Sequence, residues 1–280
     1  MKKSIPLILA SAPFAAGAAA AAGLVYLIAP GSRNKSMAAQ FAGRNIAHRG
    51  LFAKDQSIPE NSLPAFRAAV EAGYGIELDV QLSEDGKVVV FHDDDLKRVC
   101  GVDQRVDALP YEELKKLSLC GTAEYIPLFS EVLAAVGGKV PLIVELKSGH
   151  RNTELCEKTW GMLTRYQGPF CIESFDPRIV RWFYLQAPYI LRGQLATTSD
   201  DYGKQPKVNA FLMSNGLLNW LGRPQFIAYR LAEKPFTIRL AEKLGAMRVC
   251  WTSHEEGHEP ENDVVIFEHY RPALTFPHRR

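Results

Sequence analysis

The chain of 280 residues carries 33 Lys and Arg against 31 Asp and Glu, with 47% hydrophobic and 23% charged residues. This composition excludes a disordered or fibrous chain. The first 32 residues hold two lysines and no acid, so the remaining 248 residues are formally neutral. Because a nucleic-acid binder needs a surplus of basic charge, we expect no nucleic-acid partner.

A long uncharged stretch occupies the start of the chain. It runs from Ser4 to Ser32, and its most apolar part, Gly23–Ile28, lies near its end. As an α-helix these 29 residues would reach ~43 Å, more than the ~30 Å hydrocarbon core of a bilayer. We therefore predict that residues 1–32 form a single-pass N-terminal membrane anchor.

Two other interpretations of this segment remain open. Lys2 and Lys3 form a basic start and Ala18–Ala20 offers a peptidase site, so a cleaved signal peptide and a secreted protein are the first alternative. A buried or peripheral helix is the second. Because basic residues flank both ends of the stretch, the positive-inside rule does not fix the side of the membrane.

From residue 44 onward, short β-branched runs alternate with longer amphipathic stretches, which is typical of a parallel α/β sheet. Nine strands are predicted, at Asn45–His48, Gly75–Val80, Val88–His92, Leu142–Lys147, Phe170–Phe175, Leu191–Ala196, Phe226–Arg230, Met247–Thr252 and Val264–Glu268. Helices are predicted at Leu63–Ala72, Tyr111–Leu117, Phe129–Val136, Thr153–Tyr166, Pro177–Leu185 and Thr237–Leu244.

The gap between the second and third predicted strands is too short for a parallel crossover. It contains Asp85-Gly86, which predicts an antiparallel hairpin that brings positions 77–79 opposite positions 91–93. Without the return strand, eight strands remain, as in a (β/α)8 TIM barrel, and 248 residues approach the ~250 of such a barrel. We predict one barrel domain over residues 33–280, with an insertion at about 93–125.

Polar residues gather at the carboxyl ends of the predicted strands, where barrel active sites are built. His48 ends the first strand, and the hairpin places His92 beside the second. Glu77 and Asp79 share one face of the second strand because side chains alternate along a strand. Glu145 ends another barrel strand, so the sequence predicts that two histidines and three acids converge.

Three converging carboxylates would repel one another unless a cation lies between them. An all-oxygen set suits Ca²⁺ or Mg²⁺ rather than zinc. The two histidines supply the general acid and general base of a hydrolysis at neutral pH. Arg49 and Lys147 add positive charge that can bind an anionic phosphate. Together these groups predict phosphodiester cleavage.

The sequence resembles the glycerophosphodiester phosphodiesterase family. The matching segments are Ala47–Gly50 (AHRG), Pro59–Phe66 (PENSLPAF), Ile76–Gly101, Ile126–Leu133 (IPLFSEVL), Pro141–Lys147 (PLIVELK), Glu173–Phe175 (ESF) and, more weakly, Val249–Ser253 (VCWTS). The resemblance implies a distorted (β/α)8 barrel with a small insertion after the second histidine. It also implies hydrolysis of a small-molecule glycerophosphodiester to an alcohol and glycerol 3-phosphate.

The resemblance further implies a role for each polar residue of the site. The acid–base pair would be His48 and His92. The ligands of a divalent cation would be Glu77, Asp79 and Glu145. The phosphate contacts would be Arg49 and Lys147, and the residues close to the substrate would be Glu60, Asn61 and Trp251.

The chain departs from the family pattern after the last tryptophan. The family often continues as WTVN, whereas this chain reads Trp251-Thr252-Ser253-His254. We expect Trp251 to face the substrate's glycerol or alcohol, with a packed core tryptophan as the alternative. We expect His254 and His258 to be solvent-exposed loop residues rather than ligands. Glu268, at the end of the last strand, is a candidate for a further carboxylate at the barrel rim, but we do not count it among the site residues.

Two other functions remain open. A membrane-tethered phospholipase acting on lysophospholipids or related lipids would keep the barrel and change the substrate, and a membrane anchor favours it. A non-catalytic, membrane-tethered binding or scaffold protein is the other, although such a protein has no need of both histidines. The sequence leaves the head group of the substrate and the oligomeric state open.

Overall fold

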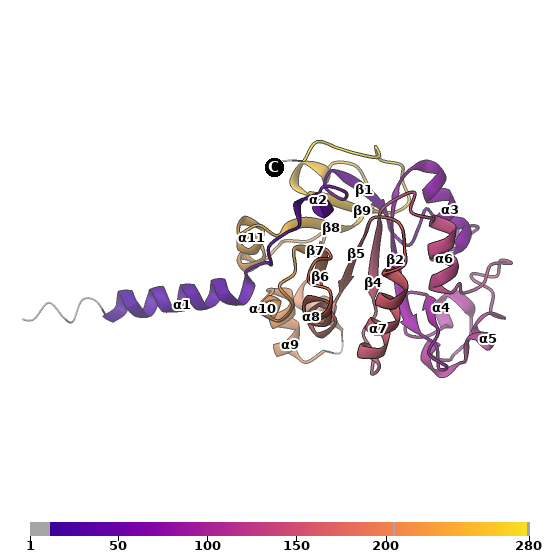
Figure 1. Cartoon of the computed structure of the whole chain (residues 1–280), viewed down its shortest axis with the longest axis horizontal. Coiled ribbons are helices and arrows are strands. Elements are labelled where there is room, and N and C mark those ends of the chain that lie inside the picture. Colours follow the sequence, from indigo (N-terminus) through magenta and orange to yellow (C-terminus); the bar gives the residue numbers. More distant parts are fainter. Residues whose placement is uncertain (1–11, 204, 279–280) are drawn as a thin grey trace, which may run out of the picture.

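The computed structural model describes residues 12–203 and 205–278, and its centre is a closed barrel of eight parallel strands (Figure 1). These strands are β1 (Arg44–Ala47), β2 (Gly75–Leu82), β4 (Leu142–Leu146), β5 (Phe170–Ser174), β6 (Arg192–Ala196), β7 (Phe226–Arg230), β8 (Met247–Ser253) and β9 (Val264–Phe267). The barrel closes because β1 pairs in parallel with both β2 and β9. The TIM barrel predicted from the sequence is confirmed.

The ninth strand, β3 (Val88–Val90), pairs antiparallel with the end of β2, with Val80 opposite Val90. β4 occupies one edge of β2, so β1 and β3 share the other edge. β1 pairs with the first two residues of β2 and β3 with the last three, which places β3 beyond the carboxyl end of β1. The predicted hairpin therefore exists, and the hydrogen bond from Phe91 N to the Asp79 carbonyl carries the chain into His92 beside the barrel mouth.

Most of the longer helices lie where the sequence predicted them, between successive strands. They are α3 (Leu63–Ala72), α6 (Phe129–Val136), α7 (Asn152–Leu163), α8 (Pro177–Gln186) and α11 (Phe236–Lys243). The sequence analysis missed α2 (Lys35–Ala38), α4 (Lys97–Cys100), α9 (Lys207–Ser214) and α10 (Asn219–Gly222), and α5 is shorter than expected, Tyr111–Leu114. Short 3₁₀ turns occupy Val106–Ala108, Ser199–Tyr202 and Glu259–Glu261.

The turn after β1 is packed directly against the start of α3. Gly50 has a φ of 81°, and a Cβ there would lie 3.0 Å from the Ala65 side chain and the Phe66 ring. Only glycine fits this backbone without strain. Ser62 caps α3 by accepting a hydrogen bond from Ala65 N. This packing brings the residues on both sides of Gly50 and Ser62 to the mouth of the barrel.

Two apolar layers hold the barrel together. Inside it, Ile46, Ile143, Leu195 and Val249 belong to one buried cluster. A second and larger cluster fills the space between the strands and the helices α3, α6, α7 and α8. The segment 93–125, which contains α4 and α5, packs around a cluster of its own against β3, to one side of the barrel in Figure 1.

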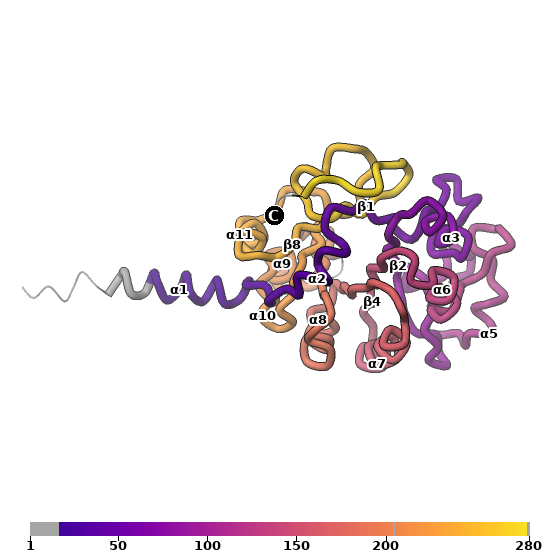
Figure 2. Tube along the Cα trace, turned by 45° about the horizontal axis from the view of Figure 1, so that its top comes forward, coloured from indigo at the N-terminus to yellow at the C-terminus, as the bar shows by residue number. Residues whose placement is uncertain are grey.

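The first described helix, α1 (Ala12–Ile28), leads away from the barrel in both views (Figures 1 and 2). Only its last turns touch the rest of the chain: Ile28 is fully buried, and Arg223 Nη1 donates hydrogen bonds to the carbonyls of Tyr26 and Ala29. In the part of the chain that the structure describes, no helix combines the length and apolarity that a bilayer crossing requires. Residues 1–11, the first third of the predicted anchor, lie outside the described residues, and the anchor stays a prediction.

Candidate functional site

Three buried carboxylates meet at the carboxyl ends of β2 and β4. Glu77, Asp79 and Glu145 are 2%, 1% and 7% exposed, and one oxygen from each lies within 4.8 Å of the others. The strand register explains this, because Asp79 lies directly opposite Glu145 and Glu77 precedes Asp79 by two residues on the same face. The structure therefore brings together the three acids that the sequence singled out.

The charge states of these acids depend on one another. Burial, together with Asp79 and Glu145, raises the pKa of Glu77 well above its ordinary value. Burial alone would also raise the pKa of Asp79, but Lys147, His92 and Arg49 outweigh it and hold that pKa below its usual range. A barrel end with this much buried negative charge is stable only if cations lie close to it.

One oxygen of the cluster shows that the donor set fits a metal ion. Asp79 Oδ1 is buried and accepts no hydrogen bond, although Lys147 Nζ lies 3.4 Å away. A buried anionic oxygen without a hydrogen-bond donor is costly. Three carboxylates converging on that oxygen form an all-oxygen site of the kind that hard divalent cations occupy. The cluster can therefore hold a metal.

The two histidines are held in the same way. His48 Nδ1 lies 2.8 Å from Glu268 Oε2, and His92 Nδ1 lies 2.6 Å from Asp93 Oδ1. Because an ionised carboxylate only accepts hydrogen bonds, each Nδ1 carries the proton that is shared with its carboxylate. Each Nε2 is thereby left for other chemistry, and His48 Nε2 lies 3.9 Å from Glu77 Oε2.

The electrostatic surroundings of His48 and Glu268 reinforce the hydrogen bond between them. Burial, and then the positive charge of Arg49, lowers the pKa of His48, so the neutral imidazole is favoured. Burial alone would raise the pKa of Glu268, but its hydrogen bond with His48 lowers that pKa to about 2. Glu268 therefore stays ionised near neutral pH and keeps its hold on His48.

A single cavity joins these groups. It has a volume of about 330 Å³ and is lined by both histidines, Glu77, Glu145, Arg49, Lys147 and Trp251, among others. A larger groove of about 1010 Å³ shares Glu145, Lys147, Phe175 and Trp251 with it and continues outward over α9 and α10. The cavity can accept a compact polar group while the groove accommodates a longer one.

A chain of alternating charges connects the carboxylate cluster with His92. Arg49 Nε lies 3.7 Å from Asp79 Oδ2, and Arg49 Nη1 donates to Glu60 Oε1 at 2.7 Å. Glu60 accepts two further hydrogen bonds from Arg98, at 2.7 and 2.9 Å. Arg98 also donates two hydrogen bonds to Asp93, at 2.6 and 3.1 Å. Asp93 in turn holds His92, so the insertion segment is tied into the site.

The other residues predicted from the sequence also reach the site. Asn61 Nδ2 donates to Asp79 Oδ2 at 2.8 Å, and Lys147 Nζ lies 2.9 Å from Glu145 Oε1. Trp251 packs edge-on against Phe175 at 5.7 Å and donates from Nε1 to the Ala228 carbonyl. The tryptophan ring therefore lines the cavity, while the hydrogen bond from its nitrogen holds it to β7 of the barrel.

Four charged residues of the site were not assigned to it from the sequence. Glu173 on β5 lies opposite Glu145 in the strand register and is 1% exposed, and burial raises its pKa well above the ordinary value. Its place in the ESF motif was the only signal. Asp93 and Arg98 lie in the matching segment Ile76–Gly101 and Glu268 ends the last predicted strand. None of the three was given a role, because each acts through a partner distant in the sequence or through an orientation that spacing does not reveal.

Parts of the sequence are similar to characterised and named phosphodiesterases. A glycerophosphodiester phosphodiesterase from Caldanaerobacter subterraneus subsp. tengcongensis is 42% identical over 113 residues, which cover 37% of this chain and 45% of that protein. One from Bacillus altitudinis is 33% identical over 173 residues, covering 58% and 68%. The match thus spans about half to two thirds of the length of these curated relatives.

A solved structure supports the fold. A phosphodiesterase from Oleispira antarctica, in complex with the product sn-glycerol-3-phosphate, superposes with a TM-score of 0.67 at 23% identity, covering 82% of this chain and 94% of that one. The model of the glycerophosphoryl diester phosphodiesterase family matches residues 48–271, a range that contains both histidines and every acid described above. The resemblance predicted from the sequence is confirmed, and the chain belongs to the glycerophosphoryl diester phosphodiesterase family.

Proposed function

We propose that the chain hydrolyses a glycerophosphodiester to an alcohol and glycerol 3-phosphate. The observation that carries the proposal is the pair of histidines, each held at Nδ1 by a carboxylate, lining one cavity with Glu77 and Glu145 of the three-carboxylate cluster and a buried lysine. Acid–base groups beside concentrated positive charge are what cleavage of a phosphodiester requires. Membership of the family supports the same reaction.

Glu77, Asp79 and Glu145 would hold the divalent cation in this scheme. Their all-oxygen donor set favours Ca²⁺ or Mg²⁺ over a softer metal. When bound, such a cation supplies charge that stabilises the phosphoryl oxygens of the transition state.

The histidines would move the protons of the reaction. One Nε2 accepts a proton from the nucleophile as its oxygen bonds to phosphorus, and the other protonates the oxygen of the departing alcohol as the bond from phosphorus to that oxygen breaks. With water as the nucleophile this gives glycerol 3-phosphate directly. With the 2-hydroxyl of the glycerol it gives a cyclic phosphate, which a water molecule opens in a second step with the same two groups. Glu268 and Asp93 each hold the Nδ1 proton of their histidine, so the ring that accepts a proton at Nε2 is the neutral imidazole and the ring that donates from Nε2 carries a second proton, as the imidazolium. The pair therefore supplies an acceptor and a donor without rotating either ring.

Lys147 and Arg49 would bind the phosphate in different ways. Lys147 lies in the cavity between Asp79 and Glu145, and burial alone would lower its pKa, but these two acids raise the pKa above its ordinary value. Its charge is thus permanent at neutral pH. Arg49 is paired with Glu60 and Asp79, so its guanidinium is not free to bind the phosphate with all of its donors. It contributes mainly through the positive electrostatic potential that it adds to the cavity. Trp251 would line the path of the substrate's glycerol or alcohol.

The groove outside the cavity favours a second candidate, a lysophospholipid substrate. Its lining includes Phe175, Met213, Leu218, Leu221 and Trp251. A glycerophosphodiester with a small head group would leave most of these apolar side chains in contact with water. An acyl chain laid along them would gain free energy in proportion to the apolar area it removes from water.

We also propose that residues 1–32 attach the barrel of residues 33–280 to a membrane, as a single-pass anchor in the uncleaved chain. In support, the described residues of α1 from Gly17 to Gly23 are uncharged and exposed, while Ile28 at its end is buried against the barrel. The attachment would hold the groove close to lipid.

Replacing either histidine should remove turnover without unfolding the barrel. His48→Ala and His92→Ala each delete a proton-transfer group, so we expect glycerol 3-phosphate release from glycerophosphocholine to fall at least ~10²-fold. His150→Ala, at an exposed histidine outside the cavity, is the matched control. Turnover near that of the parent chain in either site variant would refute the acid–base assignment.

The two candidate substrates can be separated at Met213. Met213→Glu places a charge in the apolar part of the groove, so we expect it to raise KM for lysophosphatidylcholine and to leave glycerophosphocholine hydrolysis unchanged. Val208→Glu, at a 69% exposed position on the same helix, is the control. If the parent chain does not cleave lysophosphatidylcholine, the second candidate is wrong.

Membrane attachment can be tested on the exposed face of α1. Ala18→Asp with Ala22→Asp adds two charges one helical turn apart, and we expect this variant to leave the membrane fraction in which the parent chain sediments. The control, Ala72→Asp with Ala134→Asp, changes two exposed alanines of the barrel helices. It should sediment with the membrane fraction as the parent chain does. A parent chain found outside the membrane fraction would contradict the anchor.

Arg98 should act as a positioning residue for His92. Arg98→Ala leaves Asp93 and Glu60 without their shared partner, so we expect kcat to fall about tenfold, about 1.4 kcal/mol, with KM little changed. Arg98→Lys should not restore kcat, because an ammonium cannot bridge two carboxylates with paired hydrogen bonds.

The matched control for Arg98 is Arg105→Ala. Arg105 lies in the same segment and pairs with Asp107 at 2.8 Å, but it does not line the cavity and its ion-pair partners are not those of Arg98. Equal kcat values for the two alanine variants would show that the charge chain does not position His92.

A further inference from the structure

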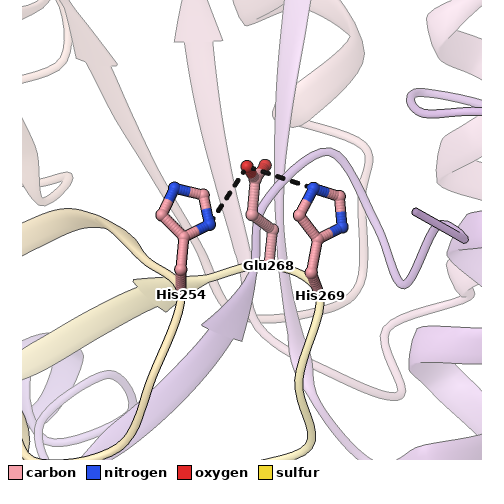
Figure 3. Close-up of side chains that lie close together, drawn as sticks. All are labelled: His254, Glu268 and His269. Carbon is pink, nitrogen blue, oxygen red and sulfur yellow. Dashed lines mark ion pairs between the residues drawn. The ribbon is translucent and has the colours of Figure 1, made fainter.

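A second group of metal-binding side chains lies at the rim of the barrel, apart from the three-carboxylate cluster. His254 follows β8, while Glu268 and His269 follow β9, and these two strands are neighbours. Glu268 N donates to the Ser253 carbonyl at 2.9 Å, so the two strand ends are fixed side by side. Figure 3 shows both imidazoles turned toward the carboxylate of Glu268 from opposite sides.

The spacing of the three donor atoms matches a tetrahedral metal site. His254 Nδ1 and His269 Nε2 each lie 3.4 Å from Glu268 Oε1, and the three donor atoms all lie within 4.8 Å of one another. Zinc bound at about 2.0–2.1 Å in tetrahedral geometry separates its ligand atoms by about 3.3–3.4 Å. Two of the three edges already have this length, and the third, between the two imidazoles, is no longer than 4.8 Å.

The donor chemistry selects a class of ion. Two imidazole nitrogens with one carboxylate suit zinc and related first-row metals, whereas Ca²⁺ and Mg²⁺ prefer all-oxygen sets. With three protein ligands, a fourth position stays open to water. The site is also accessible, since the His254 side chain is 60% exposed and those of His269 and Glu268 are 22% and 17% exposed.

The local backbone holds one ligand in an uncommon conformation. His269 has a φ of 66°, in the left-handed region that non-glycine residues rarely adopt. Its ring is supported by an edge-on contact with Phe52 at 5.0 Å and stacks on His254 at 5.9 Å. Strained residues of this kind persist where the surrounding structure holds them, often at ligand sites.

Neighbouring polar groups do not compete for this position. His258, the other histidine of the loop, shares a hydrogen bond with Ser253 Oγ, which also bonds Tyr270. Glu268 Oε2 is bonded to His48 Nδ1, which leaves Oε1 as the oxygen that faces His254 and His269.

We propose that His254, Glu268 and His269 form a zinc-class metal site that is separate from the cation site of Glu77, Asp79 and Glu145. The sequence analysis placed His254 in a solvent-exposed loop without a ligand role. Its exposure is as expected, but its side chain faces Glu268. Through the two oxygens of Glu268, the proposed site and His48 share one carboxylate.

The experiment uses the full chain, stripped of metal with a chelator and held in excess Mg²⁺ so that the three-carboxylate cluster is filled. Zn²⁺ is titrated against a chromophoric zinc indicator, and Co²⁺ is followed by its visible absorption, which is strong in four-coordinate sites. We expect a single zinc ion per chain, with affinity at least about 100-fold weaker in His254→Ala and in His269→Ala, since loss of even an outer-shell partner costs 10–100-fold.

The control is His150→Ala, because His150 is exposed and lies 3.6 Å from a carboxylate of Asp107 without a second histidine. It should bind Zn²⁺ as the parent does. His254→Gln provides a second change at a highly exposed position, and circular dichroism checks that each variant is folded. Zinc affinity that is equal in the parent and both alanine variants, or a parent that does not bind zinc, would overturn the proposal.

Discussion

The site depends on keeping several carboxylates buried at one end of a barrel. Glu77, Asp79 and Glu145 converge within 4.8 Å, and Glu173 lies beside Glu145 on the next strand. Each buried charge costs several kcal/mol unless an opposite charge is close. Lys147 and Arg49 meet this demand in part, and the oxygen of Asp79 that lacks a hydrogen bond lies where a metal ion could meet the rest of it.

The remaining charges follow from that requirement. Arg49 can lie against Asp79 only if its own guanidinium is held, and Glu60 holds it. Glu60 is then shared with Arg98, which also fixes Asp93 and so the imidazole of His92. A row of alternating ion pairs thus runs across the barrel mouth from the carboxylate cluster to His92. The orientation of the His92 imidazole is therefore connected, through these ion pairs, with the charge balance of the carboxylate cluster.

The topology of the barrel explains why one histidine comes from a barrel strand and the other from a hairpin. β1 is short and pairs with only the first residues of β2, which leaves the end of that edge free for β3. His48 therefore follows the end of β1, while His92 follows β3, which runs antiparallel to β2. Both then line the same cavity as Glu77 of β2 and Glu145 of β4.

Much of this arrangement could be predicted from the sequence. Strand periodicity located all nine strands, and the i, i+2 spacing of Glu77 and Asp79 placed both carboxylates on one face. Four short helices, α2, α4, α9 and α10, were missed because one or two turns carry little periodicity. Arg98 and Glu268 were missed because their roles arise from contacts 38 and 220 residues away along the chain.

The claim that a cation in the carboxylate cluster supports phosphodiester hydrolysis is tested most directly by metal removal. Glycerol 3-phosphate release from glycerophosphocholine would be measured for the parent chain and for Glu77→Gln, before chelation, after it, and after Ca²⁺ or Mg²⁺ is restored. We expect chelation to abolish turnover, and restored metal to recover it fully in the parent but only partly in Glu77→Gln. Unchanged turnover in the chelator-treated parent would contradict the account.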